Sequence, residues 1–259
     1  MKKHLLILFA ALLPLVASAE KVEIDGIWYN LYSDESQAEV TYKGDRSWDY
    51  DEYSGSITIP ATVTHNGVEY SVTSIGEEAF WGCSSLTAIN IPEDSQLASI
   101  GDEAFEDCSS LTAITLPEGV TSIGSSAFWG CSSLTAINIP ENSQLTSIEE
   151  SAFWGCSSLT AINIPASVTS IGDYAFWGCS SLTAINIPEG SQLASIGDEA
   201  FEDCSSLTAI NIPEGVTSIG ERAFEGCSSL TSITLPASLT SIGERAFWGC
   251  SSLTAITIP

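Results

Sequence analysis

The stretch Cys83-Ser84-Ser85-Leu86-Thr87-Ala88-Ile89-Asn90-Ile91-Pro92 decides the fold, because its opening Cys-Ser-Ser-Leu-Thr returns at regular intervals along the chain. The later copies begin at Cys108, Cys131, Cys156, Cys179, Cys204, Cys227 and Cys250. Long steps, as from Cys83 to Cys108, alternate with steps that are shorter by two positions, as from Cys108 to Cys131, until two short steps end the series. A nearly fixed period of this size is typical of solenoids, in which each unit buries its apolar side only by stacking on its neighbours.

The positions inside each repeat predict a strand and its end. Leu86, Ile89 and Ile91 recur as Leu, Ile, and Ile or Leu in every coil. Side chains alternate along a strand, so Ile89 and Ile91 should face the core together. Pro92 and its equivalents cannot donate a ladder hydrogen bond and should end the strand. Stacking then predicts one parallel sheet with strands about 4.8 Å apart.

The return segment of the coil, Gly76–Gly82, is expected to form one helical or 3₁₀ turn, because its acidic start suits the positive end of a helix dipole. The equivalents of Gly82 are all Gly or Asp, which predicts a positive φ at all eight positions. The long steps owe their length to a longer loop after the strand, as in Glu93–Leu97 compared with Glu118–Val120. The alternation implies a doubled unit made of one long and one short step, with loops that bulge from one edge on every second coil.

Residues 1–19 have the pattern of a secretory signal peptide. Lys2 and Lys3 supply the positive start, Leu5 to Val16 the apolar stretch, and Ala17-Ser18-Ala19 the small-residue cleavage site. The apolar stretch is too short for the roughly 20 residues that span a bilayer as a helix. We therefore expect a secreted or cell-surface protein that does not insert directly into the membrane.

Residues 20–70 alternate as short strands and are interpreted as a β-rich amino-terminal cap. A hairpin turning at Asp25-Gly26 is expected first, and a turn at His65–Val68 precedes the repeats. The aromatic residues Trp28, Trp48 and the nearby tyrosines should pack as part of this cap, since an open solenoid end must be covered. Residues 71–259 hold eight coils, and no polar capping repeat follows the last strand. An uncapped end predicts a tendency to self-associate.

The charge balance excludes several classes of partner. The chain has 33 acidic and 7 basic residues, for a formal net charge of −26. Such a surface repels phosphate backbones and anionic lipid, so nucleic-acid binding is not expected. Solubility is the simplest role of the acidic residues, because no acidic loop has the spacing of a dedicated calcium site.

The eight cysteines of an exported protein invite a disulfide interpretation. Each cysteine, however, occupies the same place in successive coils, so neighbouring Cβ atoms should stay parallel and too far apart to bond without distortion. Buried free thiols that behave as small apolar side chains are the favoured alternative. A zinc site would need closely spaced cysteines or histidines, and the sequence has none.

No residues are predicted to be catalytic, to bind a cofactor or to bind a metal. The one histidine outside the leader, His65, lies at a hairpin turn and has no nucleophile motif beside it. An active site also needs a single unique constellation of groups, whereas repeats offer copies of one set. We therefore predict that the chain is not an enzyme.

The pattern Ser-Ile-Gly-x-x-Ala-Phe-x-x-Cys-Ser-Ser-Leu-Thr-x-Ile-x-Ile-Pro over residues 71–259 closely resembles the BspA-like, or Treponema-type, leucine-rich repeats. The segments 23–31 and 38–41 also resemble the amino-terminal region of such proteins from Bacteroidetes. The resemblance implies a secreted or surface protein, since some family members bind extracellular-matrix proteins and host cells. It supplies no catalytic residue. The fold class expected is thus an α/β repeat solenoid, a right-handed leucine-rich-repeat superhelix with a parallel sheet.

Two columns of side chains are candidates for partner binding. The first is a column that holds Trp or Glu and should face solvent; it reads Trp81, Glu106, Trp129, Trp154, Trp177, Glu202, Glu225 and Trp248. Its tryptophans form either an exposed strip for a protein or glycan, or a shielded layer lying flat over the return turns. The second column points outward from the strands and includes Asn138, Asn163, Asn186 and Asn211. These amides either bond along the sheet or line a broad protein-binding face.

The sequence therefore favours an exported, non-catalytic binding protein of the adhesin type. Its expected partner is a host or extracellular-matrix protein, or another cell. A glycan-binding module that uses the tryptophan strip is the first alternative. A structural or self-assembling surface protein is the second.

Overall fold

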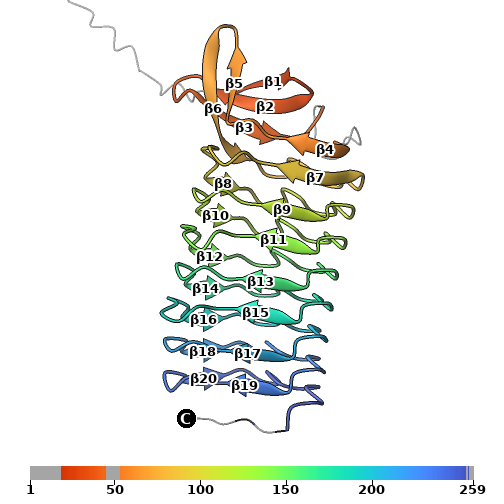
Figure 1. The fold of residues 1–259 in the computed structure, drawn as a ribbon, viewed down its shortest axis with the longest axis vertical. Coiled ribbons are helices and arrows are strands. Elements are labelled where there is room, and N and C mark those ends of the chain that lie inside the picture. The colour runs from red at the N-terminus through yellow and green to blue at the C-terminus, as the bar shows by residue number, and fades with distance from the viewer. Residues whose placement is uncertain (1–18, 45–52, 255, 257–259) are drawn as a thin grey trace, which may run out of the picture.

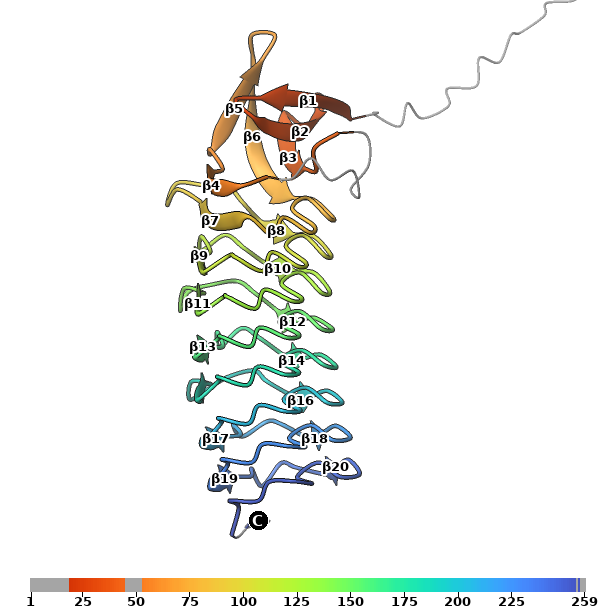
Figure 2. The same cartoon turned by 90° about the vertical axis from the view of Figure 1, so that its right-hand side faces the viewer.

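The computed structural model describes residues 19–44, 53–254 and 256 (Figure 1). The chain forms an elongated stack of coils, and a twisted amino-terminal sheet covers one end of the stack (Figure 2). The leader expected over residues 1–19 lies outside the described residues except for Ala19, and so does Trp48 of the cap loop.

The sheet at the amino-terminal end contains the strands expected there. β1 (Glu20–Ile24) and β2 (Ile27–Tyr32) form an antiparallel hairpin, and β3 (Gln37–Thr41) pairs with β2. β5 (Thr62–His65) and β6 (Val68–Ile75) form a second hairpin. β6 also runs parallel to β3 on one side and to β8 on the other. One sheet thus continues from this end of the molecule into the coils.

Each coil contributes two short strands, and equivalent strands run parallel from coil to coil (Figure 1). The first series, the long-strand ladder, is β4 (Gly55–Thr58), β7 (Leu86–Asn90), β9 (Ala113–Thr115), β11 (Ala136–Asn138), β13 (Ala161–Asn163), β15 (Ala184–Asn186), β17 (Ala209–Asn211) and β19 (Ser232–Thr234). The second series, the Ser-Ile ladder, is β8 (Ser99–Ile100), β10 (Ser122–Ile123), β12 (Ser147–Ile148), β14 (Ser170–Ile171), β16 (Ser195–Ile196), β18 (Ser218–Ile219) and β20 (Ser241–Ile242). The Ser-Ile ladder was not expected, because two residues carry no visible alternation.

The long-strand ladder is parallel as expected, but it is interrupted and does not form one continuous sheet. The pairs β9–β11, β13–β15 and β17–β19 each have three residues in register. Between β11 and β13 only Ala136 and Ala161 pair, and β15 with β17 or β7 with β9 do not pair at all in the described chain. The complete pairs belong to the short steps and the broken ones to the long steps. The extra residues of a long step lengthen the path after the strand, and the strand ends on either side separate.

The backbone beyond the strands follows the same alternation. Across the short steps, the N–H of Leu116 donates to Asn138 O at 3.0 Å, and the N–H of Ile164 donates to Asn186 O at 2.9 Å. The equivalent N–H groups on the long steps donate no hydrogen bond within the described residues; they belong to Ile91, Ile139 and Ile187. Every second step is therefore open at its carboxyl-terminal edge.

Each long loop is stabilised by a buried serine. The side chains of Ser95, Ser143 and Ser191 are at most 8% exposed. The Ser95 hydroxyl accepts a hydrogen bond from the N–H of Leu97 at 3.1 Å, and the other two loops repeat this contact. This turn delivers Leu97 into the core in the place that Val120 takes in a short loop.

The return segments are not helical, so that part of the predicted fold was wrong. The described residues contain no helix, and the segment is a succession of turns. The N–H of Ala79 donates to Gly76 O at 3.3 Å, and the N–H of Cys83 donates to Phe80 O at 3.1 Å. The third residues of these turns, Glu78 and Gly82, have φ of 54° and 68°, which is the mark of a type II turn. A left-handed residue in every four prevents any helical run.

The prediction of positive φ in the Gly82 column is confirmed at all eight positions, including Asp107 at 56° and Asp203 at 57°. A second left-handed column was missed, and it contains no glycine: Glu78, Glu103, Ser126, Ser151, Tyr174, Glu199, Arg222 and Arg245. Side chains of this kind carry a cost of roughly 1–2 kcal/mol in that conformation. The turns must therefore be held by contacts between coils.

Those contacts are backbone hydrogen bonds that join successive return segments. The N–H of Phe80 donates to Ala104 O at 2.8 Å, and the same bond recurs at each of the next six coils at 2.8–2.9 Å. The N–H groups of Glu78 and Gly82 donate likewise to Asp102 O and Glu106 O. This return ladder, unlike the long-strand ladder, does not depend on whether the step is long or short.

A stack of phenylalanines fills the core beside the return ladder. Consecutive ring centroids from Phe80 to Phe247 are 5.0–5.5 Å apart, with planes within 15° of parallel. Tyr53 continues the stack at the amino-terminal end, 4.8 Å from Phe80 and tilted by 51°. Its hydroxyl donates to Thr41 O at 2.8 Å and accepts from the N–H of Trp28 at 2.9 Å. Tyr53 therefore joins the amino-terminal sheet to the core of the coils.

The cysteines are free and buried, as the favoured alternative required. Each thiol from Cys108 to Cys250 donates to the carbonyl of the phenylalanine in the preceding coil, at 3.1–3.2 Å. Burial raises the pKa of these thiols, in the case of Cys250 to about 11. A protonated thiol is the form that can donate this bond.

Truncating one ring of the phenylalanine stack should destabilise the whole array. Phe153 is 0% exposed, so Phe153→Ala should lower the free energy of unfolding by about 3–5 kcal/mol through lost burial and a cavity. Urea denaturation followed by circular dichroism measures the loss. Trp248→Ala, at a side chain 65% exposed, is the control and should change stability by about 0.5 kcal/mol or less. Equal losses in the two variants would contradict the assigned core.

Candidate functional site

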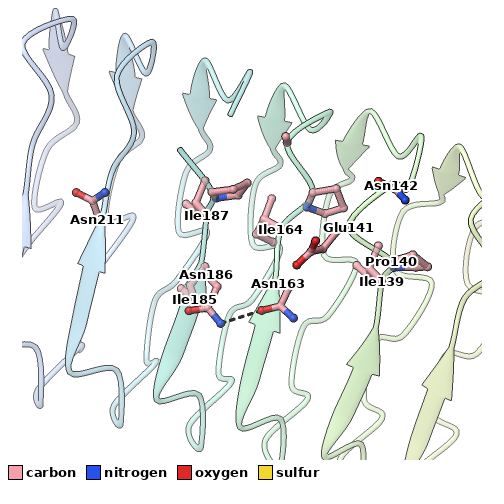
Figure 3. A pocket seen from close by; sticks show the side chains of 13 residues that line it. Ile139, Pro140, Glu141, Asn142, Asn163, Ile164, Ile185, Asn186, Ile187 and Asn211 are labelled. Carbon is pink, nitrogen blue, oxygen red and sulfur yellow. Dashed lines mark hydrogen bonds between the residues drawn. The ribbon is translucent and has the colours of Figure 1, made fainter. Parts of the chain in front are cut away.

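A groove of about 590 Å³ lies at the carboxyl ends of β11, β13, β15 and β17 (Figure 3). Its walls include the strand-end residues Ile139 and Ile187 and the prolines that follow them. Asn163 and Asn186 lie on the strands between. The groove spans two of the three open steps of the long-strand ladder, one between β11 and β13 and the other between β15 and β17. It therefore exists because the coil lengths alternate.

The open step after β15 exposes apolar surface that a closed step buries, whereas Ile139 at the open step after β11 is buried. Ile164 and Pro165, on a short-loop coil, are buried. On the next coil, which has a long loop, Ile187 is half-buried and Pro188 is exposed. The N–H groups of Ile139 and Ile187 also lack acceptors within the described chain. The groove thus offers apolar side chains together with unused backbone donors.

Three of the four candidate asparagines are brought together in this groove. Asn163, Asn186 and Asn211 line it and are exposed, and Asn186 Nδ2 donates to Asn163 Oδ1 at 2.8 Å. Asn138 lies on β11 outside the lining, where its Nδ2 donates to Thr115 Oγ1 at 3.1 Å. The interpretation that these amides bond along the sheet is confirmed for the two pairs named, and a protein-binding role for the column stays a prediction.

Sequence reasoning missed the groove residues that follow the strands, among them Ile187, Pro188 and Glu141. The signal that could have located them was present in the long steps. A two-residue insertion after a parallel strand must either make the loop bulge outward or break the strand pairing. The expectation considered only a bulging loop.

The tryptophans of the first candidate column lie on the return turns, which precede the strands, whereas the groove follows them. Trp129, Trp154 and Trp177 are half-buried and stacked, with centroids 4.7 Å apart at both contacts and planes within 15°. Trp81 is also half-buried, and Trp248 is 65% exposed. The ring faces of the central stack are therefore turned toward one another and the ring edges toward solvent.

Glutamates of the same column lie against the tryptophans. Glu106 lies beside the indole of Trp81, and Glu202 lies beside that of Trp177. Burial and the neighbouring carboxylates Glu199 and Glu225 raise the pKa of Glu202 to about 7. One of its oxygens, Oε2, is buried without a hydrogen-bond partner in the described chain. Protonation of Glu202 would relieve both effects.

Glu202 should make stability depend on pH. Its folded pKa of about 7 is above the ordinary 4.5, so its contribution is greatest below pH 4.5 and is lost as the pH rises toward 7. Glu202→Gln, which mimics the neutral form, should melt near the wild-type temperature at pH 4 and above it at pH 7.5. Thermal melts of both proteins, with Glu77→Gln as the net-charge control, test this. A constant difference between Glu202→Gln and wild type across that range would contradict it.

The part of the chain that the structure describes contains no group of three or more His, Cys, Asp or Glu side chains placed to hold a metal ion. No helix long and apolar enough to cross a membrane occurs among the described residues either.

Comparison with known families matches the model of the BspA type leucine rich repeat region to residues 55–183 and 172–259, in six copies. The chain belongs to the BspA-type leucine-rich repeat family. This identifies the coils described above as leucine-rich repeats and confirms the resemblance inferred from the motif. No curated protein matches the chain significantly.

Two solved structures, PcpA and TpLRR, share the fold of this BspA-type chain. The pneumococcal vaccine antigen PcpA is 22% identical, with a TM-score of 0.60 over 86% of this chain and 72% of PcpA, a likeness that shows the fold alone. The T. pallidum leucine-rich repeat protein TpLRR is 28% identical, with a TM-score of 0.59 over 90% of this chain and 91% of TpLRR. A leucine-rich cell surface protein from Faecalibacterium prausnitzii is 26% identical over 92% and 94% of the two chains, with a TM-score of 0.40.

Proposed function

We propose that this chain is an exported, non-catalytic binding protein that holds a segment of another protein in the groove over β11–β17. The observation that carries the proposal is the groove itself, which combines exposed amides, apolar strand ends and unused backbone donors in one cavity. Binding sites combine apolar walls with a few polar groups in this way. Family membership and the predicted leader support a cell-surface or secreted location.

The chemistry of the groove favours binding over catalysis. Its polar side chains are asparagines and Glu141, and the described residues that line it include no histidine, cysteine, serine or lysine. Acid–base or nucleophilic catalysis needs a nucleophile and a base within hydrogen-bond reach of each other. Amides at successive coils instead suit contacts repeated along an extended partner, which is the usual way that solenoids bind.

The glycan alternative is weakened by the packing of the tryptophans. A sugar ring packs against the face of an aromatic ring, and the faces of Trp154 are covered by Trp129 and Trp177. Replacing the three with alanine together should therefore leave retention on a glycan array unchanged. Selective loss of glycan retention in that variant would instead support the carbohydrate alternative. Self-assembly stays a separate prediction, which light scattering over a range of concentrations would test.

A substitution that fills the groove tests the proposed function. Asn163 is exposed on β13 inside the groove, so Asn163→Trp should block a bound segment. Asn90→Trp places the same side chain on the equivalent position of β7, outside the groove, and is the matched control. We expect the wild-type chain to bind at least one member of a panel of purified matrix and host-surface proteins, and Asn163→Trp to bind at least tenfold more weakly.

The control variant should keep wild-type affinity in that assay. Equal affinities for wild type and Asn163→Trp would show that the groove is not the binding site. Turnover of any substrate by the chain would contradict the non-catalytic assignment.

A further inference from the structure

We infer that the groove selects a basic polypeptide segment in the polyproline II conformation, with a cationic side chain at every third residue. The inference rests on the proposed function and specifies its partner. It follows from the unpaired carboxylates on the long loops, two of which lie at the groove, from the distance between successive ones, and from the polar groups that the groove leaves unused.

The carboxylates are those that follow the strand-ending proline on each long loop, Glu93, Glu141 and Glu189. All three are exposed, and none takes part in an ion pair of the described chain. Glu141 lines the groove directly, and Glu189 follows Pro188 of its wall. With a net charge of −26, the surrounding field also attracts cations. A basic segment is therefore the complementary partner.

The three carboxylates recur at every second coil, once in each doubled unit. One coil advances the phenylalanine stack by 5.0–5.5 Å, so two coils advance it by about 10 Å. A polyproline II helix has three residues per turn and rises about 3.1 Å per residue, so every third side chain returns to the same face after about 9 Å. In a β-strand, residues three apart point to opposite faces. The spacing of the carboxylates thus matches polyproline II and not an extended strand.

An α-helix could also present side chains about 10 Å apart, seven residues along its axis. The groove favours polyproline II over a helix because of its polar groups. The N–H groups of Ile139 and Ile187 and the side-chain amide of Asn211 have no partner in the described chain. A polyproline II segment makes no internal hydrogen bonds and keeps its carbonyl oxygens available, whereas a helix uses its own internally.

The centre of the groove determines which residues of the bound segment fit between its cationic side chains. The short-loop coil between Glu141 and Glu189 has Ala166 where the neighbouring short loops have Glu118 and Glu214. Ala166 adds no charge, and with Ile187 and Pro188 it forms an apolar wall. Prolines between successive lysines would pack here. The segment that fits best is Lys-Pro-Pro repeated.

A pair of isomeric peptides tests the register. We expect fluorescein-labelled (Lys-Pro-Pro)₄ to bind the full chain at least fivefold more tightly, by fluorescence anisotropy at low salt, than a peptide of the same composition with its four lysines adjacent. The double variant Glu141→Gln/Glu189→Gln should weaken (Lys-Pro-Pro)₄ binding about 3- to 10-fold, as expected for two partly screened ion pairs. Glu77→Gln/Glu150→Gln, on exposed return turns, makes the same change in net charge and should alter affinity less than twofold.

Equal binding of the two peptides, or equal effects of the two double variants, would overturn the inference, because the attraction would then be a matter of net charge alone. Tighter binding of a helical peptide with lysines seven apart would overturn the conformation assigned. Failure to bind either peptide would also overturn it. The proposed function would survive each of these results if Asn163→Trp still weakened binding of a panel protein at least tenfold while Asn90→Trp did not.

Discussion

The backbone hydrogen bonds between successive return segments are the constraint on which the rest of the structure depends. They run without a break from Phe80 to Ala246, across steps of both lengths. They fix the spacing of the coils, and the phenylalanine stack and the thiol–carbonyl bonds share that register. Close approach of the backbones is also why glycine recurs at the start of the return segment. A Cβ on Gly101 would lie 2.6 Å from Glu77 N.

Because this edge of the coil is fixed, any irregularity in coil length must be absorbed elsewhere. The extra residues of the long steps lie after the strand, in the loop that leads to the next Ser-Ile strand. Strand pairing is lost there, and the separated strand ends form a cavity with backbone N–H groups that have no acceptor in the described chain. Each long loop is stabilised by a buried serine hydroxyl that accepts a hydrogen bond from a backbone N–H of the same loop; the serines are Ser95, Ser143 and Ser191. A groove can thus arise from a two-residue insertion, with leucine replacing valine at one core position, as Leu97 does relative to Val120.

The repeat architecture could be predicted from the sequence, but the local backbone conformation of the turns could not. The period, the apolar columns and the strand ends were readable, because each is repeated eight times and each has one physical cause. The return turns were wrongly predicted as helical because acidic residues at the start of a segment favour a helix. The left-handed backbone conformation of Glu78 and Tyr174 depends on hydrogen bonds to the neighbouring coil, so it cannot be recognised from the local sequence. The candidate asparagines were found because they point outward from a strand. Ile187 and Pro188 were not, because their exposure results from a missing hydrogen bond rather than from their own polarity.

Amide hydrogen exchange, resolved by residue, tests most directly the claim that the step length controls the strand ladder. The N–H groups of Leu116, Ile164 and Ile212 donate across short steps and should exchange slowly. The equivalent N–H groups of Ile91, Ile139 and Ile187 lie at long steps and should exchange much faster, while the phenylalanine amides of all these coils stay protected. Equal protection of the six isoleucine and leucine amides would contradict the account.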